Sequence, residues 1–239
     1  MSSSLKVAVA TGLFAIVHSL LASTRAKAAI ATRVRFGREL YRVAYNAQAV
    51  LAFSALAWYA ARQPKRTLYR VRGPLAGLMR LGQFGGVAFA AAAARATGVA
   101  TLSGVDNLIA VLTGMPPKHA PAAQGPEADE SGALRTRGPF MLVRHPLNLA
   151  PLAPFWLTPH MTTRRLAFNV VATAYLVLGS LHEEQRLLHE YGEAYRKYQR
   201  EGVPFFLPSV AFYSNAARCR TTAMSRSVLM MNGTPSACE

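Results

Sequence analysis

Residues 144–148 read Arg-His-Pro-Leu-Asn, and they begin the part of the chain that decides its fold. They lie early in an apolar stretch at about 140–159, and a second apolar stretch follows at about 166–181. Only a short turn with Arg164 and Arg165 joins the two, so we expect an antiparallel hairpin. The hairpin brings residues 144–148 to the same membrane face as Glu183-Glu184. Because ionisable side chains are costly beside a membrane, this cluster is a candidate functional site.

The composition indicates a membrane protein. Hydrophobic residues make up 51% of the 239 residues and charged residues only 16%, whereas soluble domains carry about 25% charged residues. The net charge of +16 raises nucleic-acid binding as an alternative. The basic residues lie beside apolar stretches rather than along one polar face, which disfavours nucleic acid as a partner. Their placement favours retention of basic loops on the cytoplasmic side and contact with membrane lipid.

The apolar stretches predict an all-α fold, a polytopic membrane bundle of about five transmembrane helices. The third stretch contains Gly82, Gly85 and Gly86, small residues that suit close helix packing. The fourth contains four prolines, and we expect it to be broken or kinked because proline removes a backbone donor. The predicted spans are about 5–22, 45–61, 74–94, 140–159 and 166–181.

A C-terminal interfacial helix is predicted after the last span. Leu187, Tyr191, Tyr195 and Tyr198 recur there at helical spacing among basic residues, and the tyrosines favour an aromatic belt at the membrane surface. We expect residues 1–208 to form one membrane domain, with the hairpin and its site at 138–208. Residues 209–239 are predicted to be a disordered tail.

The basic loops predict a topology. If the loop after the first span, residues 23–44, is cytoplasmic, five crossings place the N-terminus outside and the candidate site at the cytoplasmic face. This topology leaves the second basic loop, residues 62–72, outside. We therefore expect an integral membrane protein with its active face in the cytoplasm.

The residues of the candidate site allow several interpretations. Taken singly, His145 is more often a structural hydrogen-bonding group, Arg144 an anchor for lipid phosphate, and Glu183 or Glu184 a solvated charge. Their convergence favours a binding site for a small charged molecule. A metal site formed by His145, His182 and a glutamate is another alternative, and the lack of a helical His-x-x-x-His or His-x-x-Glu pattern disfavours it.

Other catalytic classes find no support in the sequence. The chain has no Gly-x-Ser-x-Gly elbow for serine hydrolysis. It also lacks the glycine-rich patterns of dinucleotide-binding and phosphate-binding loops. Both cysteines, Cys219 and Cys238, lie close to the C-terminus, which disfavours thiol catalysis and cysteine metal ligands at the site.

Three parts of the sequence together resemble a known family. Residues 144–148, the pair Glu183-Glu184 and residues 191–198, which read Tyr-Gly-Glu-Ala-Tyr-Arg-Lys-Tyr, resemble the integral-membrane methyltransferases. That superfamily includes isoprenylcysteine carboxyl methyltransferase and the phospholipid N-methyltransferases. The spacing across the hairpin is retained as well as the short motifs.

The N-terminal half resembles the bacterial branch that contains methanethiol S-methyltransferase, and also the NnrU-type membrane proteins. The residues that carry this second resemblance are His18-Ser19-Leu20-Leu21-Ala22-Ser23, Tyr41-Arg42, Tyr45-Asn46 and Asp106. Together the two resemblances span roughly residues 5–208.

The resemblance implies S-adenosylmethionine as the methyl donor, bound at the cytoplasmic end of the hairpin. It implies donor contacts from His145, Pro146 and one of the adjacent glutamates, Glu183 and Glu184, whose carboxylates suit an ammonium group or ribose hydroxyls. Arg144 and Glu184 are the expected catalytic residues, with Arg144 suited to pairing with the donor's carboxylate or favouring a thiolate. Asn148, a further expected donor contact, stands where the family usually has tyrosine.

The implied reaction is in-line methyl transfer, helped by positioning and desolvation. The acceptor stays open between a small thiol, a prenylcysteine carboxylate and a lipid amine, and the oligomeric state is also open. The alternative function is a non-catalytic, NnrU-like membrane accessory protein, which Asn148 and the N-terminal resemblance favour slightly. A small transporter is disfavoured because the spans show no internal repeat.

Overall fold

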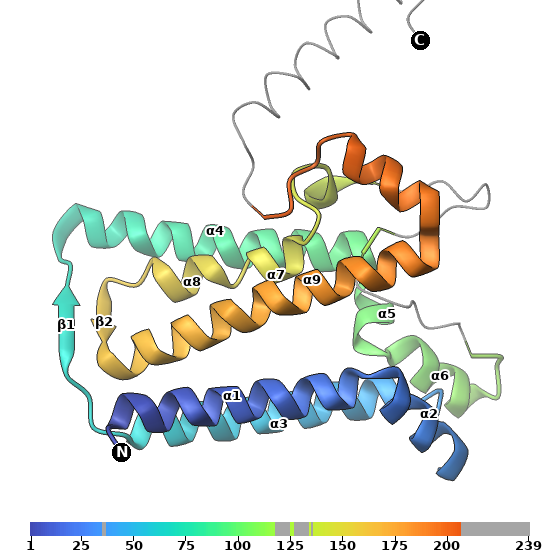
Figure 1. Cartoon of the computed structure of the whole chain (residues 1–239), viewed down its shortest axis with the longest axis horizontal. Coiled ribbons are helices and arrows are strands. Elements are labelled where there is room, and N and C mark those ends of the chain that lie inside the picture. The colour runs from blue at the N-terminus through green and yellow to red at the C-terminus, as the bar shows by residue number, and fades with distance from the viewer. Residues whose placement is uncertain (35–36, 118–124, 127–133, 135, 207–239) are drawn as a thin grey trace, which may run out of the picture.

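The computed structural model describes residues 1–34, 37–117, 125–126, 134 and 136–206. Most of this part of the chain is helical (Figure 1), which confirms the predicted all-α class apart from two short strands. The predicted tail, residues 209–239, lies outside the described residues. The elements are α1 (Ser3–Ala22), α2 (Thr24–Arg33), α3 (Tyr41–Arg62), β1 (Thr67–Arg70), α4 (Gly73–Thr97), α5 (Val99–Ser103), α6 (Val105–Thr113), the 3-10 turn η1 (Gly138–Met141), α7 (Pro146–Leu149), α8 (Leu152–Trp156), β2 (His160–Thr162) and α9 (Thr163–Arg200).

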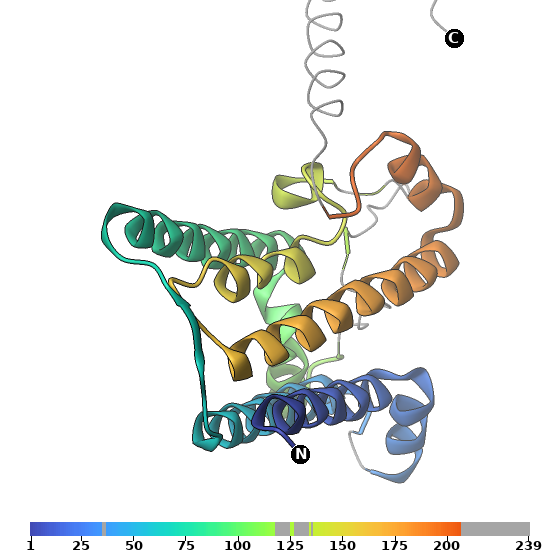
Figure 2. The ribbon, with the colours of Figure 1, turned by 60° about the vertical axis from the view of Figure 1, so that its left-hand side comes forward.

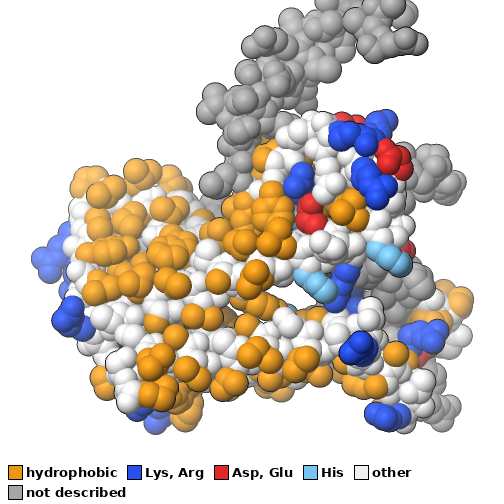
Figure 3. Space-filling model, in the orientation of Figure 1, with side chains coloured by type: hydrophobic (Ala, Val, Ile, Leu, Met, Phe, Trp, Pro, Cys, Tyr) orange, Lys and Arg blue, Asp and Glu red, His pale blue; other side chains and the backbone are white. Residues whose placement is uncertain are grey.

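Three of the described helices, α1, α4 and α9, are long and apolar enough to cross a membrane. Large apolar side chains point outward from them, among them Leu13 at 58% exposed, Phe84 at 72% and Leu178 at 65%. Figure 3 shows apolar side chains spread over one part of the molecule and charged ones gathered at its ends. Such a surface suits lipid rather than water. The prediction of a membrane protein with transmembrane helices is confirmed.

The predicted count of five spans is not confirmed. Helix α3 has 22 residues but is not one of the three candidate spans, and Arg42, Asn46 and Gln48 lower the hydropathy of its first half. The predicted fourth span is broken, as its prolines indicate. It consists of α7 with four residues and α8 with five, each too short to cross a bilayer.

The long helices lie side by side, and the broken segment fills the space between two of them (Figures 1 and 2). Helix α9 packs against α1, and α4 packs against α8. Strands β1 and β2 pair antiparallel at one end of this bundle, with Thr67 opposite Thr162 and Arg70 opposite His160. Helix α9 begins directly after β2, where the Thr162 hydroxyl accepts from the Arg165 amide and caps the helix. The strand pair therefore holds both ends of the hairpin turn in place.

Helix α9 extends well beyond the membrane core. It has 38 residues, and its straight part before Gly192, residues 163–191, is about 43 Å long, well over the ~30 Å of hydrocarbon in a bilayer. Its apolar part ends at Leu181, and the helix bends sharply at Gly192, whose φ of 50° and ψ of −117° are not helical. Glycine tolerates this positive φ because it has no Cβ. The bend turns the last two turns of α9 back toward the start of α7 (Figure 1).

The bend changes the environment of the tyrosines. Tyr195 is 0% exposed and Tyr198 is 2% exposed, and they pack with Leu187 and Val203 in a buried cluster. The predicted aromatic belt at the membrane surface is therefore wrong for these two residues. Helical spacing identified the correct face, but the bend at Gly192 directs that face into the protein.

Two neighbouring glycines of α4 allow a test of the contact between α4 and α8. A Cβ on Gly86 would lie 2.6 Å from the Ala153 Cβ and 3.0 Å from the Ala150 carbonyl oxygen, whereas a Cβ on Gly85 would meet nothing within 4 Å. Both Gly→Ala changes gain helix propensity. Only Gly86→Ala must push α8 away, so it should be about 1–3 kcal/mol less stable than Gly85→Ala. Thermal unfolding of the two variants in detergent measures the difference, and equal melting temperatures would contradict this packing.

Candidate functional site

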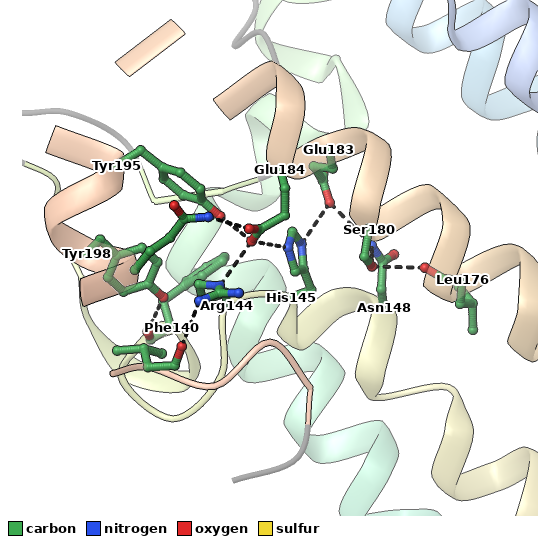
Figure 4. A network of polar contacts seen from close by, with 12 residues as sticks. Phe140, Arg144, His145, Asn148, Leu176, Ser180, Glu183, Glu184, Tyr195 and Tyr198 are labelled. Atoms are coloured by element: carbon green, nitrogen blue, oxygen red, sulfur yellow. Dashed lines mark hydrogen bonds and ion pairs between the residues drawn. The ribbon is translucent and has the colours of Figure 1, made fainter. Parts of the chain in front are cut away.

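A buried histidine joins the two glutamates of α9. The His145 side chain is 0% exposed, its Nδ1 lies 3.3 Å from Glu183 Oε2, and its Nε2 lies 2.8 Å from Glu184 Oε1 (Figure 4). An ionised carboxylate only accepts hydrogen bonds, so both ring nitrogens must donate to make these contacts. The arrangement therefore favours the doubly protonated, positively charged imidazolium.

Glu184 is the centre of the network. Its Oε1 accepts from Arg144 Nε at 3.0 Å and from the Tyr195 hydroxyl at 2.8 Å, and its Oε2 accepts from the Gln199 amide. Burial favours the neutral carboxyl, but the bonds from His145 and Tyr195 and the charge of Arg144 outweigh it and lower the pKa of Glu184 to about 2. Glu184 lies beyond the apolar part of α9 and is ionised at neutral pH.

Arg144 ties this network to the chain that follows α9. Its Nη1 donates to the Val203 carbonyl at 3.1 Å, and its backbone amide donates to the Pro204 carbonyl at 2.9 Å. The Tyr198 hydroxyl donates to the Phe140 carbonyl in the same region (Figure 4). These bonds connect η1, the start of α7 and both parts of the bent α9. Arg144 thus has protein partners that hold the fold of this end together.

Asn148 supports Glu183 from α7. Its Nδ2 donates to Ser180 Oγ at 2.8 Å and to Glu183 Oε2 at 3.2 Å. Ser180 in turn donates to the Leu176 carbonyl one turn earlier on α9. Two donors from two positions on the α7 segment, His145 and Asn148, therefore fix the same carboxylate oxygen of Glu183.

A cavity of about 1460 Å³ opens beside this network. Side chains from α1, α2, α3, α6, α7 and α9 line it, and Figure 3 shows a hollow between α9 and α1. Asn148 and Glu183 belong to its wall. The wall also carries the tyrosines Tyr41, Tyr45, Tyr175 and Tyr191, and two further carboxylates, Glu39 and Asp106.

The six residues that the sequence predicted for the site are brought together, but they divide into two groups. Asn148 and Glu183 line the cavity, while Arg144, His145, Pro146 and Glu184 are not among the described residues of its wall. Pro146 is the first residue of α7, a position for which its fixed φ is suited. Of the four residues behind the wall, His145 contacts both Glu183 and Glu184, and Arg144 contacts Glu184.

The sequence analysis missed other residues of the wall. Lys27 and Arg186 are two, and neither belongs to a motif that was singled out. A signal was present on α9, because five wall residues recur there at spacings of four, three, one and three: Tyr175, Gly179, His182, Glu183 and Arg186. That spacing marks one face of a helix, and most of these residues are polar.

The structure gives no support to a metal centre here. Within the described part of the chain, no group of three or more histidine, cysteine, aspartate or glutamate side chains is placed to hold a metal ion. His145, one member of the suggested metal set, directs both ring nitrogens to carboxylates instead.

Comparison with known proteins finds relatives of one kind. The chain is 39% identical over 93 residues to the methanethiol S-methyltransferase of Pseudomonas deceptionensis, a match that covers 39% of this chain and 35% of the relative. It is 44% identical over 69 residues to the methanethiol S-methyltransferase of Mycobacterium tuberculosis, covering 29% of this chain and 28% of the relative. The matched segment is similar to methanethiol S-methyltransferases.

This similarity confirms the resemblance to the methanethiol S-methyltransferase branch over the matched segment. The match spans about a third of the length of these curated relatives. A third relative, the methanethiol S-methyltransferase of a Pseudomonas strain, is 40% identical over 72 residues, which is 30% of this chain and 28% of the relative. No family model matches the chain, and no solved structure matches it.

Proposed function

We propose that this chain is a membrane methyltransferase that uses S-adenosylmethionine and acts on a small thiol. The observation that carries the proposal is the position of Glu183. Its carboxylate lies on the wall of a large cavity, and hydrogen bonds from His145 and Asn148 hold it there. Similarity to methanethiol S-methyltransferases supports the reaction class and favours a small thiol over a prenylcysteine carboxylate or a lipid amine.

The residues of the cavity fit such a donor. Its volume of about 1460 Å³ exceeds the roughly 300–1,000 Å³ of common ligand pockets, so donor and acceptor can be held together. S-adenosylmethionine carries a positive sulfonium and a positive ammonium group, which the carboxylates of Glu183 and Asp106 suit. The tyrosine rings of the wall suit the adenine ring and, by cation–π attraction, the sulfonium.

The proposed roles follow from the two groups of site residues. Glu183 and Asn148 bind the donor, while His145 and Glu184 hold Glu183 and the start of α7 in position. Arg144 and Pro146 fix the backbone at the start of α7, the helix that carries Asn148. When bound, the donor supplies a methyl group on a positively charged sulfur. The protein orients the reacting groups and excludes water, effects that supply much of the rate of such a displacement.

The same proposal includes a location. The end of the bundle with the cavity carries basic residues that follow α1, because Lys27 and Arg38 line the cavity and Arg25 lies on α2 beside Lys27. Basic loops are retained in the cytoplasm, so we place this face on the cytoplasmic side of a bacterial inner membrane. The soluble donor then reaches the site directly from the cytoplasm.

The test is methyl transfer by the purified full chain in detergent, with labelled S-adenosylmethionine and three acceptors. We expect labelled product with methanethiol and none above background with a prenylcysteine or with a phospholipid amine. Product with either of the other two acceptors would overturn the thiol proposal. Absence of donor binding by calorimetry would instead favour the non-catalytic accessory protein.

A further inference from the structure

Three cations line one part of the cavity, on three different helices. Lys27 lies on α2, Arg42 is the second residue of α3, and Arg186 lies on α9 one turn after Glu183. Each is partly buried, whereas Arg38 on the same wall is exposed. Burial first, and then repulsion from Arg42 and Arg186, lower the pKa of Lys27. Lys27 therefore lies near enough to Arg42 and to Arg186 to be repelled by both.

The positive cluster shares the wall of the cavity with three carboxylates, Glu39, Asp106 and Glu183. Lys27, Arg42 and Arg186 form no ion pair with a carboxylate among the residues that the structure describes. Arg144 differs, because it is paired with Glu184 at 3.0 Å. Partly buried cations without partners are unfavourable, and a bound anion relieves the cost.

We propose that Lys27, Arg42 and Arg186 form an anion pocket that binds the acceptor as its thiolate. The anion pocket stands on the cavity geometry, while the identity of the anion as a thiolate rests on the proposed function. A free thiol is mostly protonated at neutral pH, and only the thiolate is a strong nucleophile. An opposite charge within about 4–6 Å lowers the pKa of an acid by roughly 1–3 units, which raises the fraction of thiolate at neutral pH about tenfold to a thousandfold.

The reaction balances in charge and atoms. The S–H bond of the acceptor breaks, and its proton leaves to solvent water through the open side of the cavity. A lone pair of the thiolate sulfur forms the new bond to the methyl carbon. The electron pair of the broken carbon–sulfur bond stays on the donor's sulfur, so one negative and one positive sulfur become two neutral thioethers.

The first experiment measures anion binding without any methyl transfer. The probe is carbon-13 thiocyanate, a small linear anion with a terminal sulfur, and the readout is the broadening of its NMR signal by the full chain in detergent. We expect Lys27→Met/Arg42→Gln to weaken binding at least tenfold. The control, Lys65→Met/Arg72→Gln, removes the same two charges from exposed positions between α3 and α4, and it should bind like the wild type. Equal binding by all three proteins would overturn the pocket.

The second experiment measures the pH dependence of kcat/KM for methanethiol. We expect the double variant to need a pH at least one unit higher for half of its maximal kcat/KM, with a loss of about tenfold at pH 7 that shrinks at alkaline pH. The single variant Lys27→Arg keeps the positive charge, so it should retain most of the activity that the wild type has at neutral pH. Calorimetry should show unchanged donor binding. A parallel pH profile, or loss of donor binding in the double variant, would overturn the thiolate role.

The two proposals fail in different ways. If the wild type binds thiocyanate at these cations but transfers no methyl group, the anion pocket stands and the methyltransferase proposal falls. If the wild type transfers methyl groups and the variants do so with an unchanged pH profile, the methyltransferase proposal stands and the thiolate pocket falls.

Discussion

Glu184→Ala should lower the free energy of unfolding by about 3–5 kcal/mol, the typical cost of removing one partner from a buried ion pair. Glu184 accepts from Arg144, His145, Tyr195 and Gln199. Its loss leaves the guanidinium and the imidazolium side by side without the carboxylate between them. The connection between α7 and the bent end of α9 should loosen. Thermal unfolding in detergent measures the change, and donor binding should weaken with it because Glu183 loses its support.

The matched control is Glu193→Ala on the same helix. Glu193 also pairs with two basic residues, Arg196 and Arg200, but its side chain is 66% exposed. Exposed ion pairs contribute about 0–1 kcal/mol because water screens them. The melting temperature of this variant should stay near that of the wild type. Similar losses of stability in the two variants would show that Glu184 is not the centre of a buried network.

Glu183→Gln should give the opposite pattern, a large loss of donor affinity with little loss of stability. Glutamine has the same shape but no charge, and it still accepts from His145 and Asn148. The donor's positive groups lose their carboxylate, and a hydrogen bond to a charged group contributes roughly 1.5–3 kcal/mol. The dissociation constant should therefore rise about tenfold to a hundredfold. Calorimetry with S-adenosylmethionine measures it, and labelled methyl transfer should fall at the same time.

Glu190→Gln is the control for this change. Glu190 lies two turns further along α9 and is exposed, so its variant should bind the donor like the wild type. If Glu183→Gln retained wild-type affinity, the cavity wall beside α7 would not be the donor site. The two sets of variants thus test whether Glu183 contacts the donor while its neighbour Glu184 acts as a positioning residue.

Much of the fold was predictable because each feature depends on local sequence. The apolar lengths predicted α1, α4 and α9, and the prolines predicted the broken segment of α7 and α8. The hairpin predicted that Arg144 and His145 would meet Glu183 and Glu184, since a short turn leaves few other arrangements. Because these four charged residues belong to one hairpin, their proximity could be predicted without knowing where the remaining helices lie.

Other features depend on how distant segments pack. Helical periodicity gives the face on which a residue lies but not which neighbour that face meets. The sequence could not show that Glu183 faces the cavity while Glu184 faces the buried network. It also could not show that Gly192 bends α9 so that Tyr195 becomes buried, because glycine permits a positive φ without requiring it.

The sequence by itself determined the membrane class, the helical hairpin and the charged cluster, because hydropathy, proline and short connections act over a few residues. The tertiary structure alone decided that α1, α2 and α3 close a cavity against α9, and that Lys27 and Arg42 line the same cavity as Arg186. Those residues are up to 159 positions apart in the sequence. Their presence in one cavity depends on how whole helices pack, which a local sequence pattern does not predict.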